Sequence, residues 1–160
     1  MAVLPPAENF QEFLRTLADL REAVADRALV LVEGERDRRA LSTLGVPLSS
    51  IHLVHQGVSL PRLAERIVHR RPSRVILLTD WDGKGGHLAN RLRLLFEDGR
   101  LKSDGSFRRR FALTVREGGI RCVEDLASWA ERESRLSGAP LEHFLSTLPK
   151  GEGGRRETPV

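Results

Sequence analysis

Two aspartates and a glycine-rich turn follow directly on one of the most apolar stretches of the sequence. The stretch 75–78 reads Val-Ile-Leu-Leu, and after Thr79 the chain runs into Asp80, Trp81 and Asp82. If the backbone stays extended here, residues two apart project to the same side, with Cα atoms roughly 7 Å apart. Such a carboxylate pair can hold a divalent cation, and without one the charges repel until one group takes up a proton. Asp80 and Asp82 are therefore candidate metal ligands.

A second apolar stretch, 28–32, also ends in acidic residues. Glu33 follows it directly, with Gly34 and Asp37 close behind. The chain between Glu33 and Asp80 has room for two crossovers, each with a helix, in a parallel sheet. In the strand order 2-1-3 the first and third strands are neighbours. Glu33 is then expected about 5 Å from the aspartates, at the edge where such folds bind ligands.

These residues carry a resemblance to a known family. The pattern Glu33-Gly34-x-x-Asp37 after one strand, and Thr79-Asp80-x-Asp82-x-x-Gly85 after another, resembles the Toprim domain of topoisomerases, bacterial-type primases and some nucleases. The resemblance covers about residues 25–130. It implies an Mg²⁺ or Mn²⁺ site for breaking or joining phosphodiester bonds, with Glu33 as ligand and acid/base and with Asp80 and Asp82 as ligands. For Asp37 it implies an outer role at the metal, although capping of the next helix explains this residue better.

The patterning and the resemblance together predict an α/β fold, with a Rossmann-like (Toprim) central parallel sheet of about four strands and helices on both faces. Strands are expected at 28–32, 51–54, 75–78 and 111–115, and helices at 7–25, 38–44, 60–69, 87–98, beyond 125 to about 135, and 141–148. We expect residues 1–26 to form an N-terminal helical extension packed on the domain, 27–135 the Toprim domain, 136–148 a C-terminal helix and 149–160 a disordered tail.

Glycines and a lysine mark the loops at this edge of the sheet. The turn 83–86 opens a helix, and its N–H groups and the positive end of the helix dipole favour a phosphate. Lys84 in this turn is a candidate to hold the scissile phosphate or to steady the leaving oxygen, with Gly85 in a secondary role. Gly57, after the second strand, allows a close approach of backbone to ligand. The turn is not a Walker loop, because G-x-x-x-x-G-K-[ST] is absent.

Basic residues gather near the end of the helix expected at 60–69. The formal net charge is +4, and arginine supplies nearly all of the positive charge. Compensation of the helix dipole explains part of this cluster, and a GC-rich genome explains an arginine-rich composition equally well. The cluster has more basic residues than the dipole needs. This excess indicates a phosphate-tracking surface, because a guanidinium group can bind two phosphate oxygens at once. The candidate nucleic-acid-binding residues are Arg36, Arg62, Arg66, Arg70, Arg71 and Lys84.

Cysteine, tyrosine and hydropathy limit the classes of function. Cys122 is the only cysteine, which excludes an internal disulfide and a multi-cysteine zinc site and favours the cytoplasm. No apolar stretch approaches the length of a membrane span or resembles a signal peptide. The sequence contains no tyrosine, so the covalent tyrosyl-phosphate step of topoisomerases is excluded unless a partner supplies the residue. We expect a nucleic-acid partner, RNA or DNA, and leave open a homo-oligomer or a larger nucleic-acid-processing partner.

Three functional hypotheses follow. The favoured one is an Mg²⁺-dependent enzyme of phosphodiester chemistry, most plausibly a nuclease acting on structured RNA or DNA. The first alternative is a non-catalytic module that binds nucleic acid or ribonucleoprotein. The second is a small-molecule phosphatase or phosphotransferase, because Asp80-Trp81-Asp82 also resembles the Asp-x-Asp loop of haloacid-dehalogenase-like phosphatases. That family places its loop near the start of the domain, whereas here the loop lies at mid-chain.

Overall fold

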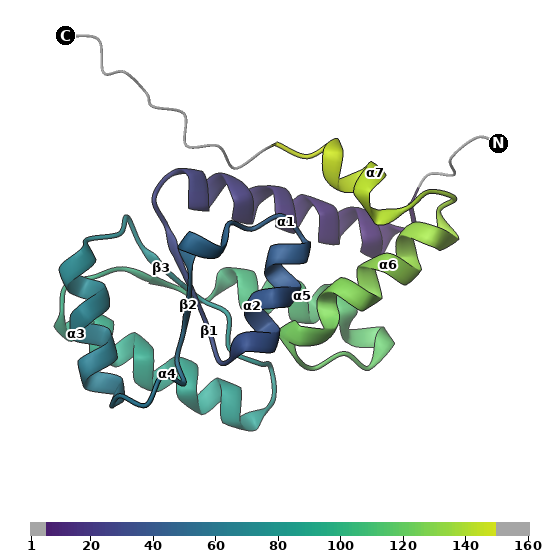
Figure 1. The fold of residues 1–160 in the computed structure, drawn as a ribbon. Helices are drawn as coiled ribbons and strands as arrows, with labels where there is room; N and C mark the ends of the chain where they lie inside the picture. Colours follow the sequence, from purple (N-terminus) through teal and green to yellow (C-terminus); the bar gives the residue numbers. More distant parts are fainter. Residues whose placement is uncertain (1–5, 150–160) are drawn as a thin grey trace, which may run out of the picture.

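Four parallel strands form a sheet at the centre of the molecule. The computed structural model describes residues 6–149, with β1 (Leu29–Val32), β2 (Ile51–Leu53), β3 (Val75–Leu77) and β4 (Ser103–Asp104). The strand order is β2-β1-β3-β4 (Figure 1). Val30 is in register with Ile51 on one side and with Ile76 on the other. The predicted α/β fold is confirmed, and its first three strands lie in the expected order.

Alternate residues of the strands face two separate layers of helices, because successive side chains of a strand point to opposite faces. Leu29, Leu31, Val75 and Leu77 pack with α3 (Leu60–Arg70) and α4 (Gly83–Asp98). On the other face, Val30, Val32, Ile76 and Leu78 pack with α1 (Glu8–Ala25), α5 (Ser106–Val115) and α6 (Leu126–Leu136). Both faces of the sheet are therefore buried, as the continuous apolar strands indicate.

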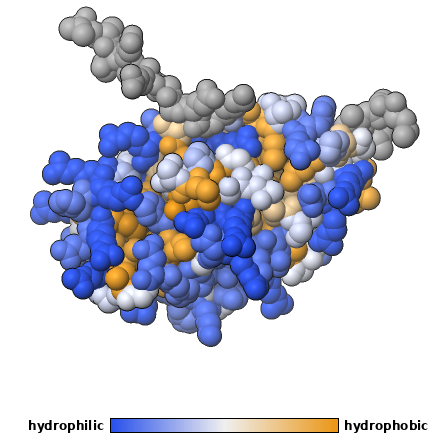
Figure 2. Space-filling view, viewed as in Figure 1, coloured by the Kyte–Doolittle hydropathy of each residue, from blue (hydrophilic) through white to orange (hydrophobic). Residues whose placement is uncertain are grey.

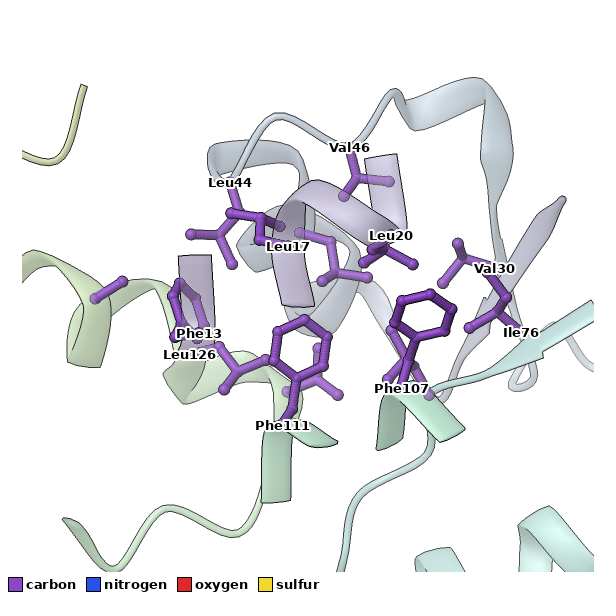
Figure 3. Packing of buried hydrophobic residues seen from close by; sticks show 14 of the residues in the cluster. Phe13, Leu17, Leu20, Val30, Leu44, Val46, Ile76, Phe107, Phe111 and Leu126 are labelled. Carbon is purple, nitrogen blue, oxygen red and sulfur yellow. The ribbon is translucent and has the colours of Figure 1, made fainter. Parts of the chain in front are cut away.

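Aromatic side chains fill the larger of the two cores (Figure 3). The ring of Phe13 on α1 lies 5.7 Å from that of Phe111 on α5 and 5.1 Å from that of Trp129 on α6. Each fully buried side chain of this size contributes roughly 1.5–3 kcal/mol by leaving water. The N-terminal helix expected at 7–25 is thus an integral part of the packing. None of the helices within residues 6–149 is long and apolar enough to span a bilayer.

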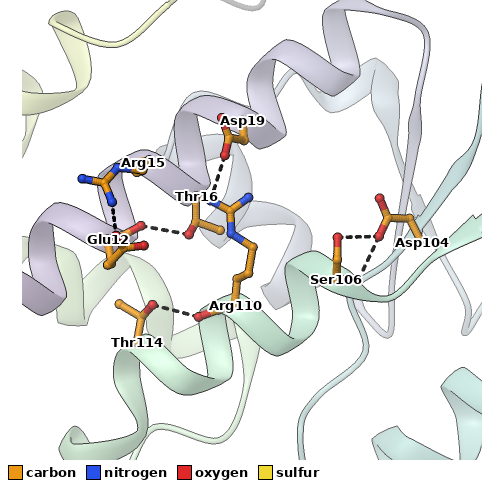
Figure 4. Close-up of polar contacts among 8 residues, drawn as sticks. All are labelled: Glu12, Arg15, Thr16, Asp19, Asp104, Ser106, Arg110 and Thr114. Carbon is orange, nitrogen blue, oxygen red and sulfur yellow. Dashed lines mark hydrogen bonds and ion pairs between the residues drawn. The ribbon is translucent and has the colours of Figure 1, made fainter.

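The strand predicted at 111–115 is wrong, because these residues belong to α5. Phe107, Phe111 and Val115 recur every four residues, and all three are buried against the α1 side of the core. The carboxylate of Asp104 accepts hydrogen bonds from the backbone N–H and the hydroxyl of Ser106, the first residue of this helix, and Gly105 is the capping residue (Figure 4). The fourth strand is instead the short β4, which pairs with β3.

Two helices begin earlier in the chain than the sequence indicates. The second helix, α2 (Glu35–Thr43), starts after Gly34 rather than after Asp37. Helix α4 starts at Gly83 rather than at His87, because the carboxylate of Asp82 caps it. The glycines at 83, 85 and 86 therefore belong to its first turn.

The remaining elements connect and close the fold. They are the short 3-10 helices η1 (Leu48–Ser50), η2 (Arg116–Gly118) and η3 (Val123–Asp125), and the last helix, α7 (Leu141–Ser146). Apart from position 149, the predicted disordered tail lies outside the described residues, and the expected division of the chain into 1–26, 27–135 and 136–148 stays a prediction.

Candidate functional site

Glu33 and Asp80 meet at the carboxyl edge of the sheet. They follow β1 and β3, which pair directly in the sheet. The Oε2 atom of Glu33 accepts a hydrogen bond from the backbone N–H of Asp80, with an N···O distance of 2.7 Å. The carboxyl group of Glu33 also acts on that of Asp80 and raises its pKa. Two acids that are far apart in the sequence are thus brought into contact by the strand order.

A segment from a later part of the chain, residues 120–124, runs along the same edge. The N–H of Val123 donates to Oδ1 of Asp80 at 3.1 Å, and the N–H of Glu124 donates to Oδ1 of Asp37, also at 3.1 Å. The N–H of Trp81 in turn donates to the carbonyl oxygen of Arg121. We call residues 120–124 the edge segment. Its contacts were missed in the sequence analysis, because backbone donors leave no pattern of residue types.

Asp37 is buried beside this acidic pair. Its Oδ2 accepts a hydrogen bond from the N–H of Gly34 at 3.0 Å, and its side chain has only 6% of its surface exposed. Burial raises the pKa of Asp37, the hydrogen bond from Gly34 opposes this, and the charge of Glu33 adds to the rise. Asp37 therefore holds the start of α2 from inside its first turn rather than from the capping position that the sequence indicates. Its outer role at a metal stays a prediction.

Asp80 has an unusual proton affinity. Burial raises the pKa of Asp80 to about 7, and the neighbouring carboxyls of Glu33 and Asp37 act in the same direction, while the hydrogen bond from Val123 opposes them. Crowded carboxylates of this kind are stabilised either by a proton or by a cation. Near neutral pH the carboxyl group of Asp80 can therefore exchange its proton for a bound cation.

The carboxylate oxygens at this edge fit Mg²⁺ or Mn²⁺ that is bound jointly by the protein and a substrate. Within residues 6–149, no three His, Cys, Asp or Glu side chains form a group that could hold a metal ion. Mg²⁺, however, commonly uses one or two carboxylates and completes its shell with waters and substrate phosphates. Glu33 and Asp80 are two carboxylates that could serve in this way, and their role as ligands stays a prediction. The arrangement suits a shared site and not a cage built from protein ligands alone.

An extended backbone would point the carboxylates of Asp80 and Asp82 to the same side of the chain. The carboxylate of Asp82 instead binds the start of α4. Its Oδ1 accepts a hydrogen bond from the N–H of Gly85 at 2.7 Å, so this oxygen caps α4. The side chain is exposed at the surface. Ligation of a metal by Asp82 stays a prediction, and the second carboxylate oxygen is the atom it would use.

The loop after β3 is fixed by contacts to its backbone. The hydroxyl of Thr79 donates to the carbonyl oxygen of Gly85 at 2.7 Å. The guanidinium of Arg108 donates to the carbonyl oxygen of Thr79 at 3.1 Å and to that of Asp80 at 2.7 Å. A Cβ atom placed on Gly85 would lie 1.7 Å from the carbonyl oxygen of Asp80, so glycine is required there. The role of Arg108 was missed, because nothing in the sequence distinguishes it from the two arginines beside it.

The other predicted site residues lie around this edge with fewer contacts. Lys84 is exposed in the first turn of α4. Arg36 forms an exposed ion pair with Glu124 at 3.5 Å. Gly57 has a φ of +74°, a conformation that favours glycine. Gly34 is the capping residue of α2.

The predicted basic cluster lies on the outer surface of α3, where Figure 2 shows hydrophilic side chains at the left of the view. Arg62, Arg66 and Arg70 recur every four residues, are exposed, and line a shallow groove on this helix. A nitrogen of Arg70 also lies 2.7 Å from Nε2 of His52. Arg71 is exposed at the helix end, with a φ of +51°. The helix thus presents three arginines on one face, and their contact with phosphates stays a prediction.

Replacement of Arg62, Arg66 and Arg70 by Gln should weaken nucleic-acid binding most strongly at low salt. Each phosphate contact that is lost should reduce the slope of log affinity against log salt by about one unit. Fluorescence anisotropy at several salt concentrations measures the slope. The matched control replaces Arg15, Arg132 and Arg135, which are exposed on α1 and α6. Equal slopes for the two triple variants would show that α3 has no special part in binding.

The fold and the site together define the class of protein. A Rossmann-like sheet that brings acids to the carboxyl ends of two adjacent strands is an α/β domain with a ligand site at its switch point. A family model of the Toprim domain matches residues 28–113, and the chain belongs to this family. Toprim domains act on nucleic acids and generally bind Mg²⁺.

Relatives of similar length support the assignment. A UPF0292 protein of Methanocaldococcus jannaschii is 30% identical over 125 residues, which cover 78% of this chain and 94% of that protein. A UPF0292 protein of Thermococcus gammatolerans is 33% identical over 138 residues, or 86% and 98% of the two chains. The solved structure of a putative protein from Aquifex aeolicus has a TM-score of 0.57 at 21% identity and covers 71% of this chain and 97% of its own. This last likeness concerns the fold.

Proposed function

We propose that this protein is an Mg²⁺- or Mn²⁺-dependent nuclease that acts on structured RNA or DNA. The observation that carries the proposal is the contact between Glu33 and Asp80 at the carboxyl edge, with the pKa of Asp80 raised to about 7. Two carboxylates so placed can share a divalent ion with a substrate phosphate. When bound, the ion supplies charge stabilisation to the attacking and leaving oxygens.

The side chains around the edge have separate tasks in this proposal. Glu33 is oriented by the backbone N–H of Asp80, which occupies Oε2, and its other oxygen takes the proton of the attacking water. Asp80 is held by the N–H of Val123 and binds the ion. Lys84, exposed at the start of α4, contacts the scissile phosphate. The arginines of α3 contact phosphates further along the strand.

The direct test is a cleavage assay. Purified protein is incubated with end-labelled single-stranded, duplex and hairpin RNA and DNA, with Mg²⁺, with Mn²⁺ or with EDTA. We expect metal-dependent cleavage of at least one substrate. A small phosphate monoester in the same panel tests the phosphatase alternative. Metal-dependent turnover of the monoester alone would overturn the nuclease.

A binding module without turnover is the second candidate. It is favoured by the contact of Asp82, whose Oδ1 accepts a hydrogen bond from the N–H of Gly85 and caps α4, because this leaves fewer free carboxylate oxygens to activate a water. In this case the same edge would hold a phosphate through a shared ion with no reacting water. Binding to the nucleic-acid panel without any cleavage is the result expected for the module.

Metal-free protein should lose stability as the pH rises from about 4 through 7. The pKa of Asp80 is raised in the folded state, so the proton bound there stabilises the fold below its ordinary pKa, and this contribution disappears above about 7. Because Asp80 is half-buried, solvent screening reduces the effect to about 1–2 kcal/mol. In EDTA at pH 8, Asp80→Asn should therefore melt roughly 2–6 °C above the wild type.

With Mg²⁺ present, the wild type should melt at a higher temperature than Asp80→Asn, because the ion binds well only to the pair of carboxylates that the wild type has. The measurement is the Tm at pH 5 and pH 8, with EDTA or with Mg²⁺. Asp82→Asn keeps the cap of α4 and tests that residue separately as a ligand, while the exposed Asp98→Asn is the control. An equal Mg²⁺ response in the wild type and Asp80→Asn would contradict the metal site.

A further inference from the structure

A cleft of about 490 Å³ lies beside the carboxyl edge of the sheet where Glu33 and Asp80 meet, which we call the acidic edge. The start of α4, the helix α5 and the turn that leads into the edge segment line this cleft. Its volume is within the range of small-ligand sites, which runs from roughly 300 to 1,000 Å³. Trp81, Leu113 and Ile120 form an apolar wall, and Leu113 has 62% of its surface exposed although it is a large apolar residue. Three arginines, Arg109, Arg116 and Arg121, also line the cleft.

The cleft carries an excess of positive charge. All three arginines are exposed, and within residues 6–149 their guanidinium groups form no ion pair and no hydrogen bond. Arg74 and Arg110, by contrast, have an acidic partner. Among the residues that the structure describes, Asp82 is the only acid that lines the cleft, and its Oδ1 is already bound to the N–H of Gly85. This surface therefore suits an anion.

The indole of Trp81 is a fixed wall. Its ring N–H donates to the carbonyl oxygen of Ile120 at 2.7 Å, and its backbone N–H donates to that of Arg121 at 3.1 Å. The polar group of the ring is thus occupied. The indole packs in part against the larger core, and the surface that it presents to the cleft is apolar and can contact a base. The indole of Trp81 and the carboxylate of Asp80 contact the same edge segment, at Ile120 and Val123, so a ligand on this wall lies near the acidic pair.

We propose that this cleft binds an unpaired nucleotide adjacent to the phosphate at the acidic edge. The base stacks on the wall formed by Trp81, Leu113 and Ile120, and the arginines hold its flanking phosphates. Aromatic stacking combined with a basic groove is how proteins bind single strands, since every base has a flat apolar face. A base inside a duplex is already stacked and cannot reach this wall. The inference rests on the proposed function and narrows it to substrates with a single-stranded end, loop or bulge.

Binding without cleavage tests the inference. The probes are a labelled single-stranded dodecamer and a blunt duplex of the same length, titrated in EDTA by fluorescence anisotropy. We expect Arg116→Gln with Arg121→Gln to weaken single-strand binding about tenfold or more and duplex binding less than twofold. The control replaces Arg132 and Arg135 on α6 and should change neither probe. The single strand should also quench tryptophan emission through Trp81, because Trp129, the other tryptophan, is buried.

The possible results distinguish a failure of the cleft inference from a failure of the proposed nuclease function. Equal losses for the single strand and the duplex would overturn the unpaired nucleotide and make the arginines general backbone contacts. Unchanged affinities for both probes would overturn the cleft as a binding site while the nuclease still stands. Wild-type protein that binds neither probe, with or without Mg²⁺, would remove the proposed function and this inference with it.

Discussion

Glu33→Gln is expected to lower the rate of nucleic-acid cleavage by about 10² or more, while affinity changes little. The amide oxygen of Gln can still accept the hydrogen bond from the N–H of Asp80, so the geometry of the edge is kept. The amide oxygen binds an ion less well than a carboxylate, so the assay uses saturating Mg²⁺; what the variant then lacks is the ability to take a proton from water. A general base must ionise and reprotonate in each turnover, whereas a group that only binds an ion need not.

Single-turnover kinetics at saturating protein, with binding measured separately in EDTA, distinguishes these cases. The matched control is Glu131→Gln, an exposed position on α6. A rate equal to that of the wild type would exclude Glu33 as the base. Equal binding by both proteins, with no cleavage by either, would instead support the binding module.

Gly85→Ala should destabilise the fold by about 3 kcal/mol or more. The added Cβ would lie 1.7 Å from the carbonyl oxygen of Asp80 and 2.6 Å from its carbon, and backbone atoms cannot rotate away. The first turn of α4 must then move, which breaks the hydrogen bonds from Gly85 to Asp82 and from Thr79 to Gly85. Alanine is otherwise better than glycine in a helix by roughly 0.5–1 kcal/mol, so the clash decides the sign.

Gly83→Ala is a close control for this effect. Gly83 lies in the same turn, but a Cβ placed on it meets no atom within 4 Å. Urea denaturation should therefore show Gly83→Ala as neutral or slightly stabilising. If the two variants unfolded at the same urea concentration, the close packing of α4 on Asp80 would be refuted.

The sheet and its central acids were predictable because they depend on long apolar runs. The stretches before Glu33 and Asp80 are short, continuously apolar and rich in β-branched residues, which favours strands buried on both faces, and the short crossovers leave few possible orders. Two acids at the ends of adjacent strands must then meet. Their contact follows from topology and needs no knowledge of side-chain packing.

The errors arose where local patterns compete. Residues 111–115 contain the β-branched and aromatic types that favour strands, but Phe107 and Phe111 fit a helix that packs against Phe13. The helix expected from His87 begins at Gly83 instead, because the glycines after Asp82 accept the helical conformation and the carboxylate of Asp82 caps them. In both cases tertiary packing or a cap selected between two locally reasonable conformations.

The edge segment restricts how its own residues can change during evolution. Val123 and Glu124 hold Asp80 and Asp37 through their backbone N–H groups, so most side chains at these two positions preserve both bonds. Proline alone has no N–H to donate. Val123 is also fully buried in the larger core, whereas Glu124 is exposed. In homologues we therefore expect position 123 to stay apolar and position 124 to vary widely, with proline excluded from both.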